Sequence, residues 1–132
     1  MNTDTPDACP CDSGRPFARC CAAYLDGSDT APTAEALMRS RYTAYTLNRL
    51  DYVRATWHPN TCPPDLQPVP GLRWLGLRIK RVEAGGEGDD TGVVEFVARS
   101  KLGGRAARLH ETSSFERLDG RWVYCHGEIH RS

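Results

Sequence analysis

The amino-acid sequence predicts an α+β protein in which a small cysteine-rich segment precedes a layer of helices on an antiparallel sheet. Four of the six cysteines lie between Cys9 and Cys21. Apolar residues then recur with helical spacing, and the second half of the chain alternates apolar and polar side chains between glycine-containing turns. Helices followed by a run of strands indicate that the helices cover one face of the sheet.

The composition is that of an ordinary globular protein. The 132 residues are 39% hydrophobic and 26% charged, and the formal net charge is zero, so nothing indicates the basic surface of a polyanion-binding protein. The sequence contains neither a signal-peptide pattern nor a run of about 18 apolar residues. We therefore expect a cytoplasmic protein without a membrane segment, whose clustered cysteines bind metal or do redox chemistry rather than form disulfides.

The N-terminal segment cannot build a core unaided. Residues 1–25 are rich in Cys, Pro and Asp and lack apolar periodicity, so a bound metal must supply the stability. The polar residues 26–32 are typical of a short linker. We predict two units, a zinc knuckle over residues 1–27 and an α+β domain over residues 33–132.

Two helices are expected after the linker. The first is predicted over residues 33–47, with Thr33 as its N-cap and an amphipathic apolar pattern. A shorter helix follows and ends at His58-Pro59, because the residue before a proline avoids the helical conformation. Residues 60–71 hold four prolines and predict an irregular connection.

The second half of the chain has the pattern of strands. Its runs are rich in Val, Ile, Phe and Trp, and turn signals such as Gly103-Gly104 and Asp119-Gly120 separate them. Short turns of this kind join antiparallel neighbours, so a meander is expected. The strands are predicted at residues 72–84, 91–102, 105–117 and 121–128.

The N-terminal cysteines have the spacing of a metal site. Cys9 and Cys11 form a C-x-C pair, and eight residues later come the adjacent Cys20 and Cys21. Four thiolates at about 2.3 Å complete a tetrahedral shell around Zn²⁺, which leaves no position for water and is typical of a structural site. Iron is the less favoured ion, and buried free cysteines or a thiol redox pair are the alternatives without a metal.

Two arginines flank the knuckle. Four thiolates around one Zn²⁺ carry a formal charge of about minus two, and Arg15 and Arg19 are expected to balance it. Together with Phe17, the same arginines suggest an alternative role in binding single-stranded nucleic acid through stacking and phosphate contacts.

The cysteine segment resembles the SEC-C motif. The pattern C-P-C-x-S-G-x-x-[aromatic]-x-x-C-C runs from Cys9 to Cys21. The motif is the zinc knuckle best known from the C-terminal tail of the preprotein translocase ATPase, where the last ligand is often His rather than the Cys21 found here. In that setting the knuckle binds partners, so the resemblance implies an interaction role.

A longer resemblance covers nearly the whole chain. It rests on the sequences at residues 34–45, 56–59, 94–98, 110–113 and 122–124, which are similar to those of the YchJ-like family. That family pairs an N-terminal SEC-C knuckle with a nuclear-transport-factor-2-like domain. The resemblance therefore implies a cone-like domain of helices packed on a curved antiparallel sheet, around a pocket; a dimer is possible, because such cones often pair back to back. It supplies no biochemical function.

Arg41 is the sharpest functional clue in the predicted domain. It falls in the apolar arc of the first helix, where a buried guanidinium needs a partner, and Glu95 and Glu111 are the candidates. Two interpretations stay open: a cavity with ion pairs at its floor, or a structural Arg–Glu bridge that fixes the helix on the sheet. The predicted pocket residues are Arg41, Tyr42, Tyr45, Trp57, His58, Glu111 and Tyr124, with His110 and His126 as further candidates.

Three functions fit these observations. The first is an interaction module whose zinc knuckle docks on a protein partner while the cone binds a small ligand. The second is a hydrolase or nuclease that depends on a divalent cation such as Mg²⁺ or Mn²⁺; its candidate catalytic residues are Glu111, His110, Glu95 and Arg41. The third is nucleic-acid binding by the knuckle, which the zero net charge does not favour.

The remaining histidines and cysteines carry weaker signals. His126, Glu128 and His130 alternate along the last strand and are metal-ligand types. Cys62 and Cys125 have no activating partner beside them in the sequence, apart from His126 on the opposite strand face, so we expect ordinary thiols.

Overall fold

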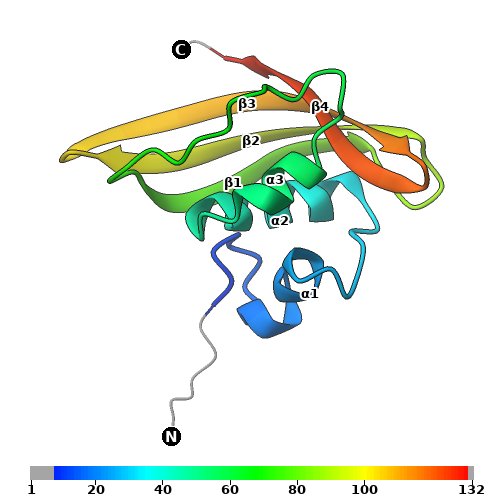
Figure 1. Cartoon of the computed structure of the whole chain (residues 1–132), viewed down its shortest axis with the longest axis horizontal. Helices are drawn as coiled ribbons and strands as arrows, with labels where there is room; N and C mark the ends of the chain where they lie inside the picture. The colour runs from blue at the N-terminus through cyan, green and yellow to red at the C-terminus, as the bar shows by residue number, and fades with distance from the viewer. Residues whose placement is uncertain (1–7, 131–132) are drawn as a thin grey trace, which may run out of the picture.

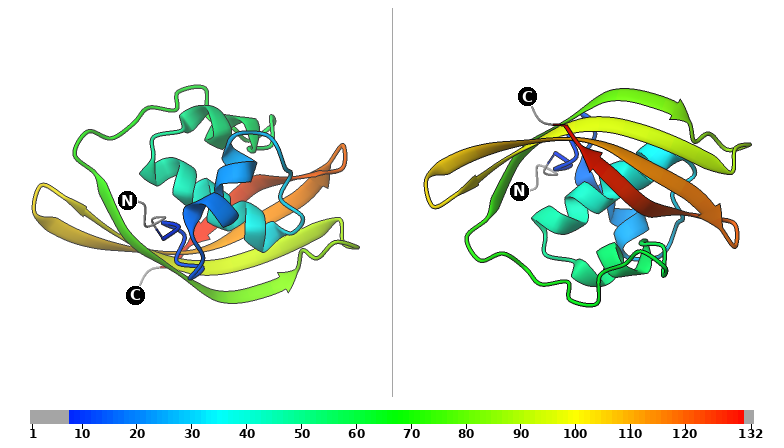
Figure 2. Two further views of the ribbon diagram at one scale, coloured as in Figure 1. Left: turned by 90° about the horizontal axis from the view of Figure 1, so that it is seen from below. Right: turned by 90° about the horizontal axis from the view of Figure 1, so that it is seen from above.

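The computed structural model describes residues 8–130, so the outer ends of the two predicted units, residues 1–7 and 131–132, lie outside the described residues. Four strands form one antiparallel sheet in the order β1-β2-β3-β4. The sheet is curved, and the helices lie against its concave face (Figures 1 and 2). The predicted α+β class, with helices on a curved antiparallel sheet, is confirmed.

The strands lie where the alternating pattern placed them. They are β1 (Arg73–Ala84), β2 (Thr91–Leu102), β3 (Arg105–Leu118) and β4 (Arg121–Ile129). The long β2–β3 hairpin closes with Leu102 opposite Arg105. Both intervening glycines have positive φ, 57° and 82°, as the tight turn between twisted strands requires.

Two of the helices lie between the sheet and the knuckle. α2 (Ala34–Thr46) begins at the predicted N-cap, because the Thr33 hydroxyl accepts a hydrogen bond from the Ala36 N–H at 3.1 Å. α3 (Leu50–Ala55) is the shorter second helix, and it ends before the predicted boundary at His58-Pro59, because Trp57 already forms a bridge with Tyr124 of β4. Among residues 8–130, no helix is long and apolar enough to cross a membrane.

The core lies between α2 and the sheet. The start of α2 approaches the β1–β2 turn closely: the Ala34 N–H donates to the Gly85 carbonyl at 2.9 Å, and a Cβ on Gly85, whose φ is +78°, would lie 2.8 Å from the Ala34 Cβ. Burial of each large apolar side chain contributes about 1.5–3 kcal/mol. The buried side chains of this interface include Leu37, Met38, Tyr42, Val94, Phe96, Phe115 and Trp122.

Two short helices of the knuckle were not predicted from the sequence. They are a 3-10 helix over Phe17–Arg19 and α1 (Ala22–Leu25). A single turn is too short to show apolar periodicity. α1 is one such turn, closed by the hydrogen bond of 3.0 Å from the Leu25 N–H to the carbonyl of its N-cap Cys21. The knuckle and α1 lie on the side of α2 that faces away from the sheet (Figure 1).

Candidate functional site

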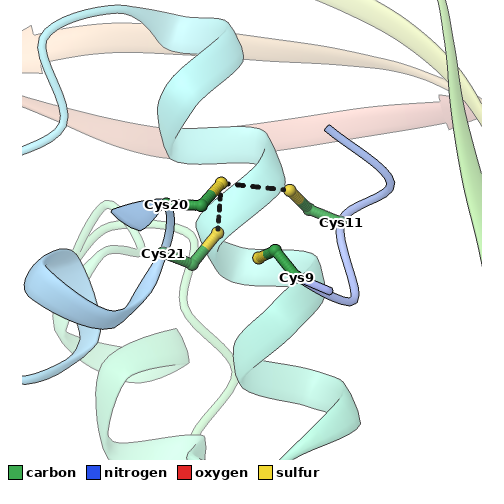
Figure 3. A group of neighbouring side chains, drawn as sticks. All are labelled: Cys9, Cys11, Cys20 and Cys21. Carbon is green, nitrogen blue, oxygen red and sulfur yellow. Dashed lines mark hydrogen bonds between the residues drawn. The ribbon is translucent and has the colours of Figure 1, made fainter. Parts of the chain in front are cut away.

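The four N-terminal cysteine sulfurs converge on one point (Figure 3). The Cys11 Sγ lies 3.5 Å from the Cys20 Sγ, which lies 3.9 Å from the Cys21 Sγ. The Sγ atoms of all four cysteines, Cys9 included, lie within 4.8 Å of one another. Sulfurs that share one tetrahedral Zn²⁺ at about 2.3 Å stand about 3.8 Å apart. The group could therefore hold a metal ion such as zinc.

A tight hairpin brings the two cysteine pairs together. Asp12 and Gly14 both have positive φ, 61° and 86°. The Cys9 N–H donates to the Arg15 carbonyl at 2.9 Å across this turn. The chain thereby doubles back, so that both sulfurs of the C-x-C pair face the adjacent cysteines.

Hydroxyl groups contact the sulfurs from two sides. The Ser13 Oγ lies 3.1 Å from the Cys20 Sγ. On α2, the buried Thr43 hydroxyl donates to the Cys21 Sγ at 3.3 Å and lies 3.6 Å from the Cys9 Sγ. The knuckle is thus bonded directly to the helix that covers the sheet.

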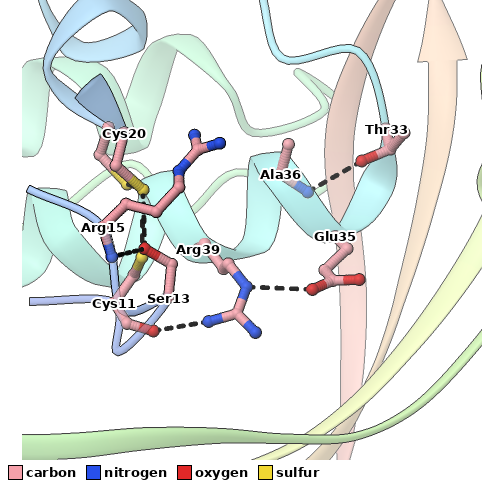
Figure 4. Close-up of polar contacts among 9 residues, drawn as sticks. Cys11, Ser13, Arg15, Cys20, Thr33, Glu35, Ala36 and Arg39 are labelled. Atoms are coloured by element: carbon pink, nitrogen blue, oxygen red, sulfur yellow. Dashed lines mark hydrogen bonds and ion pairs between the residues drawn. The ribbon is translucent and has the colours of Figure 1, made fainter. Parts of the chain in front are cut away.

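The positively charged side chain that contacts the knuckle is that of Arg39, which the sequence did not suggest. Arg39 donates from Nη1 to the Cys11 carbonyl at 2.7 Å and from Nε to the Glu35 carboxylate at 3.0 Å (Figure 4). Arg15 and Arg19 are exposed, and their side chains form no hydrogen bond or ion pair among the described residues. The i,i+4 spacing of Glu35 and Arg39 is visible in the sequence, but the position of the knuckle above them is not.

The thiols cannot all ionise while no cation lies between them. Interaction with the Cys21 thiol lowers the pKa of Cys11 to about 4. The same pair, together with burial, raises the pKa of Cys21, and burial raises the pKa of Cys9. A divalent cation removes this conflict by stabilising every thiolate at once.

The knuckle is also bonded to the sheet. The Asp12 carboxylate accepts the Leu77 N–H of β1 at 2.9 Å. This contact lies beside a register shift between Trp74 and Gly76, where the absence of a Cβ on Gly76 leaves room for the carboxylate. Three of the cysteines belong to the same buried cluster as the core of the cone: Cys9, Cys11 and Cys21.

A cavity of about 330 Å³ lies on the concave face of the sheet. Its walls are mostly aromatic, and they include Trp74 and Phe96, which the sequence did not suggest. Trp74 packs edge-on against Tyr42, with ring centroids 5.8 Å apart. The residues of the predicted pocket that line the cavity are Arg41, Tyr42, Tyr45, Trp57, Glu111 and Tyr124.

His58 does not line this cavity. Its Nε2 lies 3.5 Å from a carboxylate oxygen of Glu116, and its Nδ1 accepts the Asn60 N–H at 3.1 Å. The backbone of Trp57 forms a bridge with Tyr124 of β4, and in such an extended segment adjacent side chains point to opposite sides. Trp57 therefore enters the cavity and His58 points away from it.

Arg41 lines the cavity without the carboxylate partner that its position led us to expect. It is only 4% exposed, and it forms no ion pair among the described residues. Its Nη1 donates to the Val53 carbonyl and to the Thr56 hydroxyl, each at 2.8 Å. Its guanidinium lies 4.9 Å from the ring centroid of Trp57 and 4.7 Å from that of Tyr124. Of the two interpretations, the structural Arg–Glu bridge is therefore wrong; the cavity is present, but without an ion pair of Arg41 at its floor in the part of the chain that the structure describes.

The end of α3 takes the place of that carboxylate. A cation at a helix C-terminus is stabilised by the partial negative charge of the last carbonyls, and aromatic faces attract it as well. These neighbours do not supply a full counter-charge. Burial accordingly lowers the pKa of Arg41.

Glu111 lies in the same cavity, bonded to neighbours of its own. Its Oε2 accepts hydrogen bonds from the Ser113 hydroxyl at 2.6 Å and from the Tyr124 hydroxyl at 3.0 Å. Burial, followed by the charge of Glu111, raises the pKa of Tyr124, so the phenol stays a donor. Gly127 of β4 makes room for the carboxylate, because a Cβ there would overlap it.

His110 and Glu95 face away from the cavity. The His110 Nε2 lies 2.7 Å from the Glu95 Oε2 on the convex face, because neighbours in a strand point to opposite faces. The four candidate catalytic residues are thus divided, Arg41 and Glu111 in the cavity and His110 and Glu95 outside it. They cannot form the single centre that the hydrolase hypothesis required.

The register keeps His126, Glu128 and His130 in alternation along the last strand, but only His130 joins a group of ligand-type side chains among the described residues. The His130 ring stacks on that of His110, with centroids 4.1 Å apart, so His130 joins Glu95 and His110, while His126 and Glu128 lie outside that group. Burial raises the pKa of the Cys125 thiol to about 11, which leaves it protonated near neutral pH, as an ordinary thiol would be.

Comparison with known proteins agrees with this architecture. Residues 33–127 match the family described as YchJ, middle NTF2-like domain, and residues 6–23 match the SEC-C motif. The chain belongs to the YchJ-like family. The family match covers the cone and the motif match covers the knuckle, so both halves of the predicted resemblance are confirmed.

Relatives of this YchJ-like protein are similar over nearly their full length. A UPF0225 protein from Chromobacterium violaceum is 57% identical over 127 residues, which cover 92% of this chain and 93% of the relative. A UPF0225 protein from Cupriavidus pinatubonensis is 52% identical over 132 residues, which cover 95% and 90%.

Two solved structures are similar to the whole YchJ-like chain. The solution structure of a SEC-C motif containing protein from Rhodopseudomonas palustris has a TM-score of 0.83 at 35% identity, and the match covers 93% of this chain and 98% of that one. A crystal structure of a SEC-C motif containing protein from Psychrobacter arcticus has a TM-score of 0.71 at 23% identity, with coverage of 94% and 83%. The second likeness shows the fold alone.

Proposed function

We propose that this YchJ-like protein binds a small, largely apolar molecule with an acidic group in its cone, and that a zinc ion in the knuckle holds the cone in shape. The observation that carries the proposal is Arg41, which is 4% exposed, lines the cavity and has no ion pair among the described residues. A buried cation without a counter-charge is costly, so an anionic guest that neutralises it binds favourably.

The walls of the cavity suit an apolar guest. The volume of about 330 Å³ lies within the range of small-molecule sites, about 300–1,000 Å³. Aromatic side chains of α2, β1, β4 and the segment after α3 pack edge to face around it, including Tyr42 against Trp74 and Trp57 against Tyr124. Because these packed aromatic side chains are already ordered, little side-chain entropy is lost when a ligand binds, and apolar contacts contribute more fully to the affinity.

The polar groups of the cavity would fix the orientation of the guest. Both hydrogen bonds of Arg41 use Nη1, which leaves Nε and Nη2 as donors for an anion. Trp57 Nε1 is buried without a hydrogen-bond partner among the described residues and offers another donor. Glu111 would repel an anion, so the acidic group should lie on the Arg41 side of the cavity.

Zinc is the ion that best fits the knuckle. Four thiolates are soft ligands, and their spacing fits a closed tetrahedral shell without a position for substrate. The role of the ion is therefore structural. Through Thr43, Arg39 and Asp12 it would fix α2 and β1, which form walls of the cavity.

A matched pair of fluorescent probes tests the cavity. Anilinonaphthalenesulfonate carries one anionic group, and N-phenylnaphthylamine has the same aromatic skeleton without it. We expect the sulfonate to bind the zinc-loaded protein at least about tenfold more tightly, a difference of about 1.4 kcal/mol. The variant Leu109→Trp should fill the cavity and weaken the binding of both probes. Leu102→Trp, at an exposed position of β2, should leave the binding of both probes unchanged.

Two results would remove this proposal. Equal affinity for the two probes would show that Arg41 does not select an anion. Undiminished binding by a folded Leu109→Trp variant would move the site elsewhere, for example to the cleft of about 360 Å³ lined by Tyr24, Arg49 and Trp122.

Docking of a protein partner on the knuckle is the second candidate. Arg15 and Arg19 are exposed there, and a hollow of about 340 Å³, lined in part by Arg15, Cys20 and Arg39, opens between the knuckle and the start of α2. A basic rim of this kind favours a partner with an acidic surface.

Charge reversal tests the docking of such a partner. The double variant Arg15→Glu, Arg19→Glu should lower the affinity for an acidic protein partner by at least about tenfold. The control double variant Arg73→Glu, Arg105→Glu, at two other exposed arginines, should leave that affinity unchanged. Equal binding by both double variants would reject docking at the knuckle. If the Arg15→Glu, Arg19→Glu variant instead loses binding of a labelled single-stranded DNA probe, the nucleic-acid alternative is favoured. The position of Phe17 does not favour that alternative, because its ring is half-buried and packed against the core and is not free to stack on a base.

A further inference from the structure

The convex face of the sheet carries a second group of metal-ligand side chains. Glu95 of β2, His110 of β3 and His130 just beyond the end of β4 each offer one ligand atom, and these atoms lie within 4.8 Å of one another. We propose that this group, the convex-face trio, binds a divalent first-row transition ion at a site separate from the cysteine knuckle.

The strand register brings the trio together. Thr112 stands opposite Glu95, and His110, two residues earlier on β3, therefore points to the same face and lies diagonal to Glu95. The His130 N–H donates to the His110 carbonyl at 2.8 Å, which continues the β3–β4 ladder past the end of β4. Three neighbouring strands thus each present one ligand at the same level of the sheet.

The two oxygens of Glu95 have different partners. Its Oε1 accepts the Arg81 Nε–H at 3.1 Å, while its Oε2 lies 2.7 Å from the His110 Nε2. Arg81 therefore orients the carboxylate from outside while Oε2 faces the histidines, as residues behind metal ligands commonly do.

Metal binding would replace the close contact between the His110 Nε2 and the Glu95 Oε2. Ligand atoms around one ion at about 2.1 Å stand about 3.0–3.4 Å apart, so the 2.7 Å contact needs to open by only a few tenths of an ångström.

His130 must turn more than the other two ligands. Its ring is stacked on that of His110 at 4.1 Å with an interplanar angle of 13°, and two parallel rings cannot both direct a ring nitrogen at the same ion. The Thr112 Oγ1, 2.6 Å from the His130 Nε2, is its present partner. His130 is exposed and lies past the end of β4, so its ring can turn without disturbing the core, at the cost of the stacking on His110 and the hydrogen bond to Thr112.

The donor set decides which ions the trio prefers. Two imidazoles and one carboxylate suit Zn²⁺, Co²⁺, Ni²⁺ or Fe²⁺ better than Mg²⁺ or Ca²⁺. Three protein ligands leave positions open for water, unlike the four thiolates of the knuckle. The Glu95 and His110 side chains are 19% and 21% exposed, so an ion can reach them from solvent.

Cobalt is a suitable probe, because its absorption distinguishes thiolate from imidazole ligands. Protein whose knuckle already holds zinc is titrated with Co²⁺, and bound cobalt is counted by equilibrium dialysis. We expect about one additional ion per chain without a thiolate charge-transfer band. His110→Ala and His130→Ala should each lower the affinity for this ion by at least about tenfold, and Glu95→Gln should lower it while keeping the shape of the site.

His126→Ala is the matched control. His126 is an exposed histidine of β4, the strand that His130 follows, and it lies outside the trio. Its replacement should therefore leave the cobalt affinity unchanged. The proposal is overturned if wild-type protein takes up no additional cobalt, if a thiolate band shows that cobalt has entered the knuckle instead, or if His126→Ala weakens binding as much as His110→Ala.

Discussion

The two faces of the sheet hold the same kinds of charged groups in opposite settings. On the concave face, Arg41 and Glu111 lie in one cavity, but neither forms an ion pair among the described residues. On the convex face, Arg81 and Glu95 form a partly exposed ion pair 3.1 Å apart. Charges that are kept apart in an apolar space remain available to a guest of opposite charge, whereas an ion pair in contact with water contributes little to stability.

The two faces also depend on different sources of stability. The concave side is covered by α2, which is bonded to the cysteine knuckle through Thr43 and Arg39. The convex side rests on the hydrogen bonds of the sheet itself. The contrast predicts that loss of the metal disturbs the cavity first and the convex face last.

Removal of the metal should have the largest effect. A strong chelator, or the variant Cys11→Ser, should lower the free energy of unfolding by more than about 4 kcal/mol, because the knuckle has no core of its own. Denaturant unfolding measures the loss. Hydrogen exchange should show that amides of α2 and the Leu77 amide of β1 lose protection before those of the β2–β3 hairpin. Unchanged protection of α2 after chelation would contradict the structural role of the ion.

A smaller loss should follow crowding of the concave face at Gly127. The change Gly127→Ala places a Cβ against the Glu111 carboxylate and 2.7 Å from the Tyr124 hydroxyl, so we expect a loss of about 1–3 kcal/mol in urea unfolding. Gly88→Ala is the control, because a Cβ there meets nothing within 4 Å. In a Glu111→Ala background, Gly127→Ala should cost less stability than it does in the wild type. If Gly127→Ala costs the same in both backgrounds, the two residues are not coupled.

The smallest effect should come from the convex face. Glu95→Gln removes the ion pair with Arg81 and should cost less than Gly127→Ala, because both partners are partly exposed. The pKa of Glu95 is lowered in the folded protein from its ordinary 4.5, chiefly by His110. The stabilisation is therefore present above pH 4.5 and is lost as the pH falls through the folded pKa. Unfolding measured against pH should show wild type and variant converging in acid, and a constant difference would contradict this origin.

The sequence predicted what depends on local pattern. The Thr33 cap, the four strands and the convergence of four cysteines all follow from spacing along the chain. The sequence could not decide which strand face points inward, because both faces carry apolar residues. The position of Glu111, rather than His110, in the cavity and the meeting of His110 with His130 therefore emerged only from the structure.

The partners of Arg41 show a second limit. Burial of this residue could be inferred from the helical arc, but charge complementarity suggested a carboxylate where the fold supplies the end of α3 and two aromatic faces. Backbone carbonyls and ring faces are present in every sequence and leave no residue-specific signal. The contact of Arg39 with the Cys11 carbonyl was missed for the same reason.

The side-chain Nε–Hε resonance of Arg41 tests the central claim most directly. In the zinc-loaded protein, saturation with anilinonaphthalenesulfonate should shift this resonance, whereas N-phenylnaphthylamine should shift the aromatic resonances of the cavity and leave Arg41 nearly unchanged. If the sulfonate saturates the protein while the Arg41 resonance stays in place, the buried guanidinium is a structural cap for α3 and not the anchor of a ligand.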